Sequence, residues 1–188
     1  IIVPSRYKNT REAYAEIWTS EGSPLINSTL ALGKKIHSKS GTPVEVAMRY
    51  QYPSIEEGLV NLKAKGCSDI FVVPLYPHYA MSTILTTEKE VKRIEKQLNL
   101  NLNLNFIGTF YNEKEYISSL GNVININRSK KSDFLLFSYH GIPNRHLLKT
   151  DPTKNHCLKA KDCCEVESEA KPFCYKAVSY THLTLPTK

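Results

Sequence analysis

The chain has 188 residues, of which 41% are hydrophobic and 23% are charged. This usage indicates one globular domain and excludes intrinsic disorder, collagen and coiled coil as the main structure. No apolar run approaches the ~20 residues that a membrane-spanning helix needs. The net charge of +7 favours acidic partners such as nucleic acid, anionic lipid or a carboxylate-bearing ligand, although the basic residues are scattered along the chain.

The chain opens with Ile1-Ile2-Val3-Pro4, which resembles the middle of a strand, and it has no initiator Met. No basic segment followed by an apolar stretch is visible, so no signal peptide is predicted. We therefore expect the sequence to be a fragment of a longer protein.

Amphipathic spacing predicts helices along most of the chain. One helix is expected between Ser54, which forms a capping-box pattern with Glu57, and Gly66, which occupies a C-terminal cap position. The other predicted helices cover residues 10–18, 24–37, 86–98 and 112–120.

Short apolar segments predict strands at residues 44–48, 70–75, 102–106 and 134–137. The run at 70–75 is continuously apolar, as expected of a parallel strand buried on both faces. Strands that alternate with helices indicate βαβ units with right-handed crossovers. The sequence therefore predicts an α/β sandwich around a parallel sheet.

Chemistry-bearing residues follow three of these strands, at Arg49, at residues 74–79 (PLYPHY) and at His140-Gly141. Ligands of open α/β sheets bind outside the carboxyl ends of the strands, so these residues are candidates for one binding rim. Each also has a structural explanation. His140 can hydrogen-bond a neighbouring loop, Arg49 can pair with Glu57, and the tyrosines can pack in the core. GxGxxG, GxxxxGK[ST] and GxSxG are all absent from the sequence, which weakens nucleotide-binding and serine-hydrolase interpretations.

Four motifs in the same order resemble bacterial ferrochelatases. They are residues 17–25 (IWTSEGSPL), Arg49-Tyr50, residues 74–79 followed by Ser82-Thr83, and residues 136–143 (LFSYHGIP) followed by Arg145-His146 and Asp151-Pro152. The resemblance implies a Rossmann-like parallel-sheet sandwich of chelatase type, one lobe of two. It also implies a parent enzyme, a lyase, that inserts Fe²⁺ into a porphyrin in haem biosynthesis, with this fragment inactive by itself.

The resemblance also implies roles for individual residues. His140 corresponds to the active-site histidine that takes protons from the pyrrole nitrogens or helps to bind the incoming Fe²⁺. Arg6 and Arg49 correspond to cations near the porphyrin propionates, and Tyr76 lies in the loop that lines the metal side of the pocket. These residue types suit the chemistry, because two N–H protons leave as the metal enters and because propionates pair with arginine.

Cys157, Cys163, Cys164 and Cys174 lie within eighteen residues of one another. Without a secretory signal, a metal site is favoured over a disulfide framework. The spacing is unlike that of a zinc ribbon, and four cysteines suit a 2Fe-2S cluster, as some ferrochelatases carry. Zinc and free thiols remain the alternatives, and Cys67 is expected to be a small core residue.

These observations divide the chain into three parts. Residues 1–150 are expected to form the incomplete N-terminal lobe, and 151–177 a Cys-rich segment that leads towards the second lobe. Residues 178–188 resemble a translated sequencing adapter and are expected to be non-native, the alternative being a genuine polar tail. The second lobe of the family supplies an acidic residue opposite the histidine, and no residue here matches it.

Two rival functions stay open. One is a non-catalytic porphyrin- or metal-binding module, and the other is a chelatase for another tetrapyrrole. No nucleic-acid partner is expected. The predicted location is the cytoplasm, and the positive charge is compatible with peripheral contact with the inner membrane.

Overall fold

The computed structural model describes residues 11–128 and 134–176. The chain divides into two compact units. Within the described residues, the first unit comprises 11–70 and 90–103, and the second comprises 71–89, 104–128 and 134–176. Arg6 and the predicted non-native tail lie outside the described residues. Each unit is described by itself below.

Two helices open the first unit, as the sequence predicts. Residues 11–17 form the first helix, and α2 (Pro24–Ser40) follows after a tight turn, extending three residues beyond its predicted end. Pro24 begins α2 because proline is pre-organised for the first helical turn. Gly41 ends it in the left-handed region, with its N–H donating to the carbonyl of His37 at 2.9 Å.

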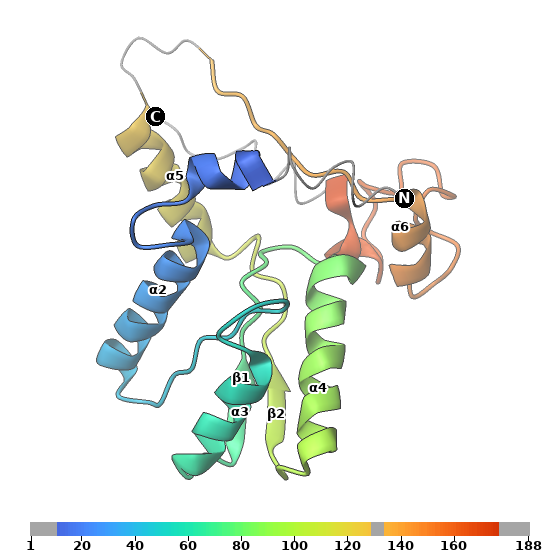
Figure 1. Ribbon diagram of the computed structural model, residues 1–188. Coiled ribbons are helices and arrows are strands. Elements are labelled where there is room, and N and C mark those ends of the chain that lie inside the picture. Colours follow the sequence, from blue (N-terminus) through green and yellow to red (C-terminus); the bar gives the residue numbers. More distant parts are fainter. Residues whose placement is uncertain (1–10, 129–133, 177–188) are drawn as a thin grey trace. The chain divides into compact units, whose positions relative to one another are not determined.

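Residues 44–48, predicted as a strand, form an extended connection from α2 to α3 (Figure 1). The prediction is wrong because the segment forms no ladder with a described strand. Its one pairing is an isolated bridge between Met48 and Ser54. The apolar side chains instead fill space beside helix glycines, since a Cβ on Gly33 would lie 2.6 Å from Cγ2 of Val46.

The capping box of α3 (Ile55–Ala64) is confirmed. Oγ of Ser54 accepts from the N–H of Glu57 at 3.1 Å, and the Glu57 carboxylate accepts from the N–H of Ser54 at 2.9 Å. Gly66, with φ of +80°, follows the helix as expected. Ile55 is buried, so the inner face of α3 contributes to the core of this unit.

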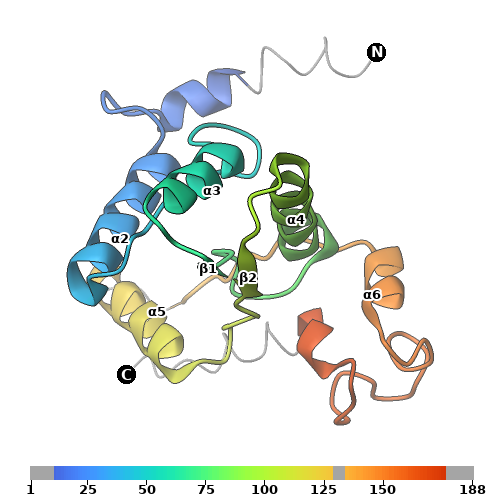
Figure 2. The ribbon, with the colours of Figure 1, turned by 90° about the horizontal axis from the view of Figure 1, so that it is seen from below.

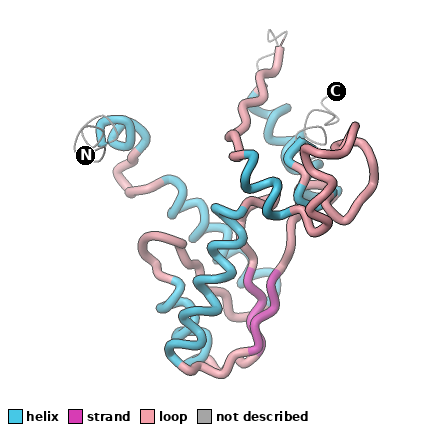
Figure 3. The backbone as a smooth tube through the Cα atoms, turned by 90° about the vertical axis from the view of Figure 1, so that its right-hand side faces the viewer, coloured by secondary structure: helices cyan, strands magenta, loops and turns pink. Residues whose placement is uncertain are grey.

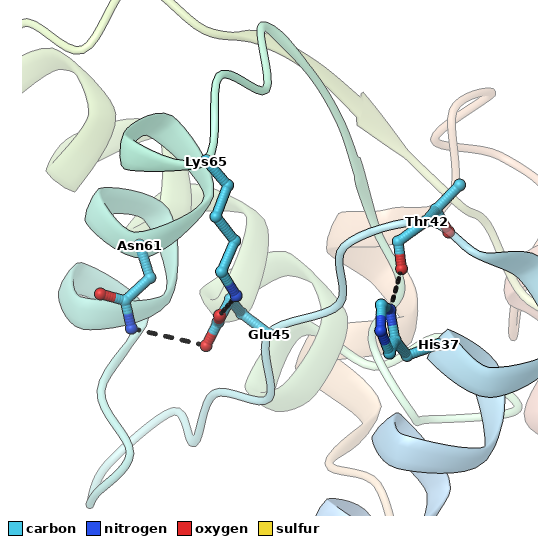
Figure 4. A network of polar contacts seen from close by, with 5 residues as sticks. All are labelled: His37, Thr42, Glu45, Asn61 and Lys65. Atoms are coloured by element: carbon cyan, nitrogen blue, oxygen red, sulfur yellow. Dashed lines mark hydrogen bonds and ion pairs between the residues drawn. The ribbon is translucent and has the colours of Figure 1, made fainter.

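A carboxylate links α3 to the preceding segment (Figure 4). Glu45 pairs with Lys65 and accepts from Nδ2 of Asn61 at 3.5 Å. Nearby in sequence, Nδ1 of His37 and the carbonyl of Thr42 lie 2.6 Å apart, which fastens the turn after α2. These contacts are exposed, so each contributes little to the free energy of folding, and their main effect is to fix the local geometry.

The sheet consists of β1 (Asp69–Val72) and β2 (Asn103–Phe106), side by side in Figure 3. The strands are parallel. The N–H of Asn103 donates to the carbonyl of Ser68 at 2.8 Å, and the N–H of Ile107 donates to the carbonyl of Val72 at 2.9 Å. The residue numbers therefore increase in the same direction along both strands. The crossover contains a π-helical turn, Met81–Leu85, and α4 (Thr86–Leu98). This βαβ unit confirms the predicted α/β class.

Helix α4 lies beside the sheet (Figure 2), and its buried residues are two apolar side chains one turn apart. Val91 is 3% exposed and Ile94 is 6% exposed, whereas the residues between them are open to solvent. The expectation that β1 is buried on both faces is wrong, because Ile70 is 5% exposed while Phe71 is 68% exposed. A two-stranded sheet covered on one face produces this alternation.

The second unit contains α5 (Lys114–Asn127), α6 (Asn144–Thr150) and a short 3₁₀ helix, Lys171–Phe173. Helix α5 was predicted but runs beyond residue 120. The predicted strand at 134–137 is wrong: the segment pairs with no described strand, and Phe134 and Leu136 are 92% and 95% exposed. None of the helices in the described ranges combines the length and apolar character that a bilayer crossing requires.

Candidate functional site

The loop that follows β1 is stiffened at both of its prolines. The N–H of Tyr76 donates to the carbonyl of Pro74 at 2.8 Å, and the N–H of Phe110 donates to the carbonyl of Pro77 at 2.9 Å. Pro74 is buried, so the loop is fixed at its base. Tyr76 remains 37% exposed, which leaves its ring available to a ligand.

His140 lies in the extended segment that precedes α6, and its side chain is exposed. The hydroxyl of Tyr175 donates a hydrogen bond to its backbone carbonyl. Two residues of the same segment, Phe137 and Tyr139, stack with ring centroids 6.5 Å apart. The backbone of His140 is therefore held from within the second unit, while its imidazole faces solvent.

Arg49 of the first unit lies over an aromatic ring, with Cζ 4.6 Å from the centroid of Tyr50. Its Nε is buried and has no hydrogen-bond partner among the described residues. The alternative pairing with Glu57 does not form, because that carboxylate caps α3. Among the described residues, Nε of Arg49 is therefore a donor without an acceptor.

A cavity of about 680 Å³ opens beside Arg49. Its lining includes two largely exposed tyrosines, Tyr50 and Tyr52, and the ion pair between Arg93 and Glu90, which measures 2.9 Å. A hydrogen bond from Arg93, and to a lesser degree the charges of Arg93 and Arg49, hold the pKa of Glu90 below its usual range. The cavity thus combines aromatic surface with an unpaired guanidinium donor.

The candidate residues belong to different units. Arg49 lies in the first unit, whereas Tyr76 and His140 lie in the second, and each is described within its own unit. Arg6 lies outside the described residues.

Asp151 organises the start of the Cys-rich segment. Its side chain is 1% exposed. Oδ1 accepts from the N–H and the hydroxyl of Thr153 at 2.9 and 2.7 Å, and Oδ2 accepts from the N–H groups of His156 and Cys157 at 2.8 Å each. Burial alone raises the pKa of Asp151, but these hydrogen bonds outweigh it and hold the pKa well below its ordinary value. The loop therefore folds around one ionised carboxylate.

The four cysteines of this segment are all reduced. Cys157 and Cys174 are buried, and the sulfurs of Cys163 and Cys164 lie 3.8 Å apart. Burial, and then the charge of Cys174, raises the pKa of Cys164 to about 12. Burial also raises the pKa of Cys157, as do the charges of Asp151 and of the thiols of Cys174 and Cys163. The thiols of Cys163 and Cys174 therefore disfavour ionisation of Cys157 and Cys164, an effect that a bound cation reverses.

In the described part of the chain, no three His, Cys, Asp or Glu side chains are arranged to hold a metal ion. Thiols are nevertheless the donor type that thiophilic metals prefer. Two thiolates on one tetrahedral ion, each about 2.3 Å from the metal, lie about 3.8 Å apart. Cys163 and Cys164 already stand at that separation. The thiol of Cys174 lies close enough to raise the pKa of Cys164, and the thiols of Cys174 and Cys163 raise the pKa of Cys157.

Sequence reasoning missed the aromatic residues on either side of Cys174. The ring of Phe173 meets Tyr79 edge to face at 4.9 Å, and the ring of Tyr175 meets His78 at 5.4 Å. The signal available in the sequence was the pair of aromatic residues, Phe173 and Tyr175, on either side of Cys174. The anchoring role of Asp151 was also not predicted from the sequence. An Asp side chain favours a turn in which it accepts from the backbone N–H two residues later, here that of Thr153.

Together these features define an α/β protein with a parallel βαβ unit, an exposed histidine in an extended segment, an arginine beside a cavity and a four-cysteine segment. The model of the family Ferrochelatase matches residues 1–180. The chain therefore belongs to the ferrochelatase family.

Named relatives agree with this assignment. The chain is 41% identical over 179 residues to the ferrochelatase of Pseudomonas fluorescens strain Pf0-1, and 41% identical over 180 residues to that of Stutzerimonas stutzeri strain A1501. It is 40% identical over 179 residues to the ferrochelatase of Opitutus terrae. Each comparison covers 94% of this chain and 52% of the relative. The chain thus spans about half the length of the curated relatives it matches.

Proposed function

We propose that this chain is part of a ferrochelatase, a lyase that inserts Fe²⁺ into a porphyrin during haem biosynthesis. The observation that carries the proposal is the family match, which extends over residues 1–180. Because the chain spans about half of each relative, the activity belongs to a parent chain that also contains the other half. We expect the 188-residue chain to be inactive by itself.

In this proposal His140 accepts protons from the pyrrole nitrogens as Fe²⁺, the second substrate, enters the macrocycle. A histidine suits the task because its pKa lies near neutrality, where a base must be both unprotonated and able to accept a proton. The exposed imidazole on an anchored backbone supports the role. Tyr76 is proposed to line the metal side of the pocket, since its ring is exposed on a loop fixed at Pro74.

Arg49 and Arg6 are proposed to bind the propionates of the porphyrin. For Arg49, support comes from its buried donor without a partner and from the cavity of about 680 Å³ beside it. A guanidinium binds a carboxylate with two parallel hydrogen bonds. The exposed rings of Tyr50 and Tyr52 on the same cavity offer apolar area to a flat macrocycle.

The test uses the parent enzyme, purified with a native sequence across both halves. We expect His140→Ala to lower the rate of iron insertion about 10²–10⁴-fold, as loss of a positioned base does, with an unchanged melting temperature. His37→Ala, a second exposed histidine, serves as the matched control and should leave the rate unchanged. A parent that binds porphyrin but inserts no Fe²⁺ would instead indicate a binding module, and preference for another metal and tetrapyrrole would indicate a different chelatase.

We also propose that Cys157, Cys163, Cys164 and Cys174 hold a 2Fe-2S cluster, a redox-active centre ligated by four thiolates. Support comes from the four-thiol donor set and from the 3.8 Å separation of the Cys163 and Cys164 sulfurs. Anaerobically purified parent should be coloured and carry about two irons per chain. Replacing any of the four cysteines by Ser should bleach it, and Cys67→Ser should not. Colourless, equimolar zinc, or five freely reactive thiols, would exclude the cluster.

The remaining proposals concern organisation and location. We propose that residues 1–150 form the N-terminal lobe, 151–177 a Cys-rich segment, and 178–188 a non-native tail. Sequencing the source gene across codon 178 tests the tail. A cytoplasmic location with peripheral contact with the inner membrane is proposed from the net charge of +7, since anionic lipid attracts basic surfaces. Co-sedimentation with anionic but not neutral vesicles tests that contact.

A further inference from the structure

An ion pair of α4 lies on the cavity beside Arg49. Glu90 and Arg93, three positions apart on the helix, both line it. Nε of Arg93 donates to Oε2 of Glu90 at 3.0 Å, and Nη2 donates to Oε1 at 2.9 Å. Arginine binds the carboxylate of a ligand in this same bidentate geometry. Since Nη1 donates to Gln97, each of the three nitrogens of the Arg93 guanidinium already has an acceptor.

The guanidinium of Arg49 is in a different state. In the described part of the chain, Arg49 forms no ion pair with a carboxylate, and its Nε has no acceptor. A hydrogen bond from Arg93 lowers the pKa of Glu90 most, and the charges of Arg93 and Arg49 lower it further against the effect of burial. The two guanidinium groups therefore lie near one carboxylate, but that carboxylate is bonded to Arg93 alone.

Two further carboxylates line the same cavity, from the start of α3. They belong to Glu56 and Glu57. Glu57 caps the helix. The hydrogen bond and the charge of Glu90 raise the pKa of Arg93 most, and the charge of Glu56 adds a smaller increase. The lining thus holds two arginines and three glutamates, which leaves an excess of one negative charge around a single open guanidinium.

We propose that Glu90 fills a second carboxylate site in this cavity and thereby makes the cavity specific for a ligand that presents one carboxylate. Arg49 binds that carboxylate. Arg93 has the geometry to bind another, but the protein's own carboxylate occupies it. A second ligand carboxylate therefore finds no free guanidinium and meets an excess of negative charge, so Glu90 is a specificity-determining residue.

The inference rests on the proposed function for the identity of the ligand, a porphyrin. A porphyrin with two propionates on neighbouring pyrroles can turn an edge with only one of them towards the cavity. A porphyrin with a propionate on each of its four pyrroles presents two at every edge. We therefore expect the cavity to favour the dicarboxylate porphyrin over the tetracarboxylate porphyrin.

The test measures equilibrium binding of these two porphyrins to the parent enzyme by fluorescence titration, without Fe²⁺. The wild type should bind the dicarboxylate more tightly. Glu90→Gln keeps the volume of the side chain, removes one negative charge and weakens the hold on Arg93. Because the Arg93 side chain is 56% exposed, we expect the preference, the ratio of the two Kd values, to fall about two- to fivefold, the range of exposed ion pairs.

Two further variants separate this effect from a general change of charge. Glu16→Gln, at an exposed position of the 11–17 helix, removes the same charge and should leave the ratio of Kd values unchanged. Arg93→Gln leaves the carboxylate of Glu90 without its partner, so it should increase the preference for the dicarboxylate. Melting temperatures of all variants should match the wild type, since the substituted side chains are on the surface or line an open cavity.

The inference is overturned if the wild type binds the two porphyrins equally, if Glu90→Gln leaves the ratio unchanged, or if Glu90→Gln and Arg93→Gln move it in the same direction. If such a parent still inserts Fe²⁺, the proposed function stands without the inference. A parent whose ratio responds as expected but that inserts no Fe²⁺ keeps the inference and rejects the proposed activity. Binding of neither porphyrin rejects both.

Discussion

The carboxylate of Asp151 accepts a hydrogen bond of 2.8 Å from the backbone N–H of Cys157 and thereby sets the first cysteine of the four. The same oxygen accepts from His156 at 2.8 Å. The ring of His156 then reaches across the loop, with Nε2 2.6 Å from the carbonyl of Cys163. Two contacts in series therefore run from the buried carboxylate through His156 to Cys163, in the middle of the Cys-rich segment.

Asp151→Ala should loosen this segment and lower the urea midpoint of unfolding, because two backbone N–H groups and the groups of Thr153 lose their acceptor. Reaction of Cys157 with a thiol reagent should accelerate, since its buried position depends on the loop. Asp162→Asn, at an exposed position of the same segment, is the control and should change neither quantity. An Asp151→Ala protein with wild-type thiol kinetics would contradict the anchoring role.

Local signals in the sequence were enough to predict most helices. The capping box of Ser54 and Glu57, the glycine at position 66 and the apolar spacing of α4 are all determined within one or two turns of chain, and the structure confirms them. The parallel β1–β2 pair was also predictable, because a buried apolar run followed by an amphipathic helix and an alternating run indicates one βαβ unit.

Strand pairing could not be predicted in the same way. Residues 44–48 and 134–137 have strand-like composition, but a strand requires a partner, and the partner is a property of tertiary structure. The hydrogen bond from Tyr175 to His140 joins residues thirty-five positions apart, so no local pattern encodes it. The candidate role of His140 could be predicted from its motif, whereas the contact between its backbone carbonyl and Tyr175 could not.

Glu57 should make stability depend on pH. Hydrogen bonds from the N–H and the hydroxyl of Ser54 lower its pKa from the ordinary value of 4.5. A carboxylate whose folded pKa is depressed stabilises the fold above its unfolded pKa, and this contribution disappears as the pH falls through the folded value. The contribution of the Glu57 carboxylate to the cap should therefore be complete at pH 7, weaken below about pH 4.5 and disappear once Glu57 is protonated.

Urea midpoints for the wild type and Glu57→Gln, measured between pH 7 and pH 3, test this dependence. The variant should be less stable at pH 7, and the difference should shrink towards zero at the acidic end. Glu16→Gln, at an exposed position of the 11–17 helix, provides the matched control and should track the wild type throughout. A difference that stays constant with pH would assign the effect to something other than ionisation of the cap.

Gly33→Ala should destabilise the first unit although alanine favours helices. The added Cβ would lie 2.6 Å from Cγ2 of Val46, and a β-branched side chain has little rotamer freedom with which to move away. Overpacking costs about 1–3 kcal/mol, against about 1 kcal/mol gained in helix propensity. Adding Val46→Ala should remove the clash and reverse part of the loss in thermal unfolding. Gly108→Ala, with nothing within 4 Å of its Cβ, should not destabilise.

Arg49→Ala in the parent enzyme should affect porphyrin binding more than the chemical step. The buried Nε of Arg49 has no partner among the described residues, so a propionate can accept from it without breaking an existing contact. Loss of a hydrogen bond to a charged group costs about 1.5–3 kcal/mol, which corresponds to a rise in the porphyrin KM of roughly 10- to 150-fold, with kcat nearly unchanged. Arg49→Lys should recover only part of the affinity, because an ammonium group keeps the charge but lacks the planar fork.

Steady-state kinetics with Arg11→Ala, an exposed arginine of the 11–17 helix, separate this effect from a general loss of positive charge. That control should leave the porphyrin KM unchanged, because screening by salt makes a single distant surface charge weak. If Arg49→Ala leaves KM unchanged but lowers the unfolding midpoint, Arg49 holds the loop through its stacking on Tyr50 and does not bind substrate. A rise in KM that Arg49→Lys partly reverses assigns the cavity beside it to a carboxylate-bearing ligand.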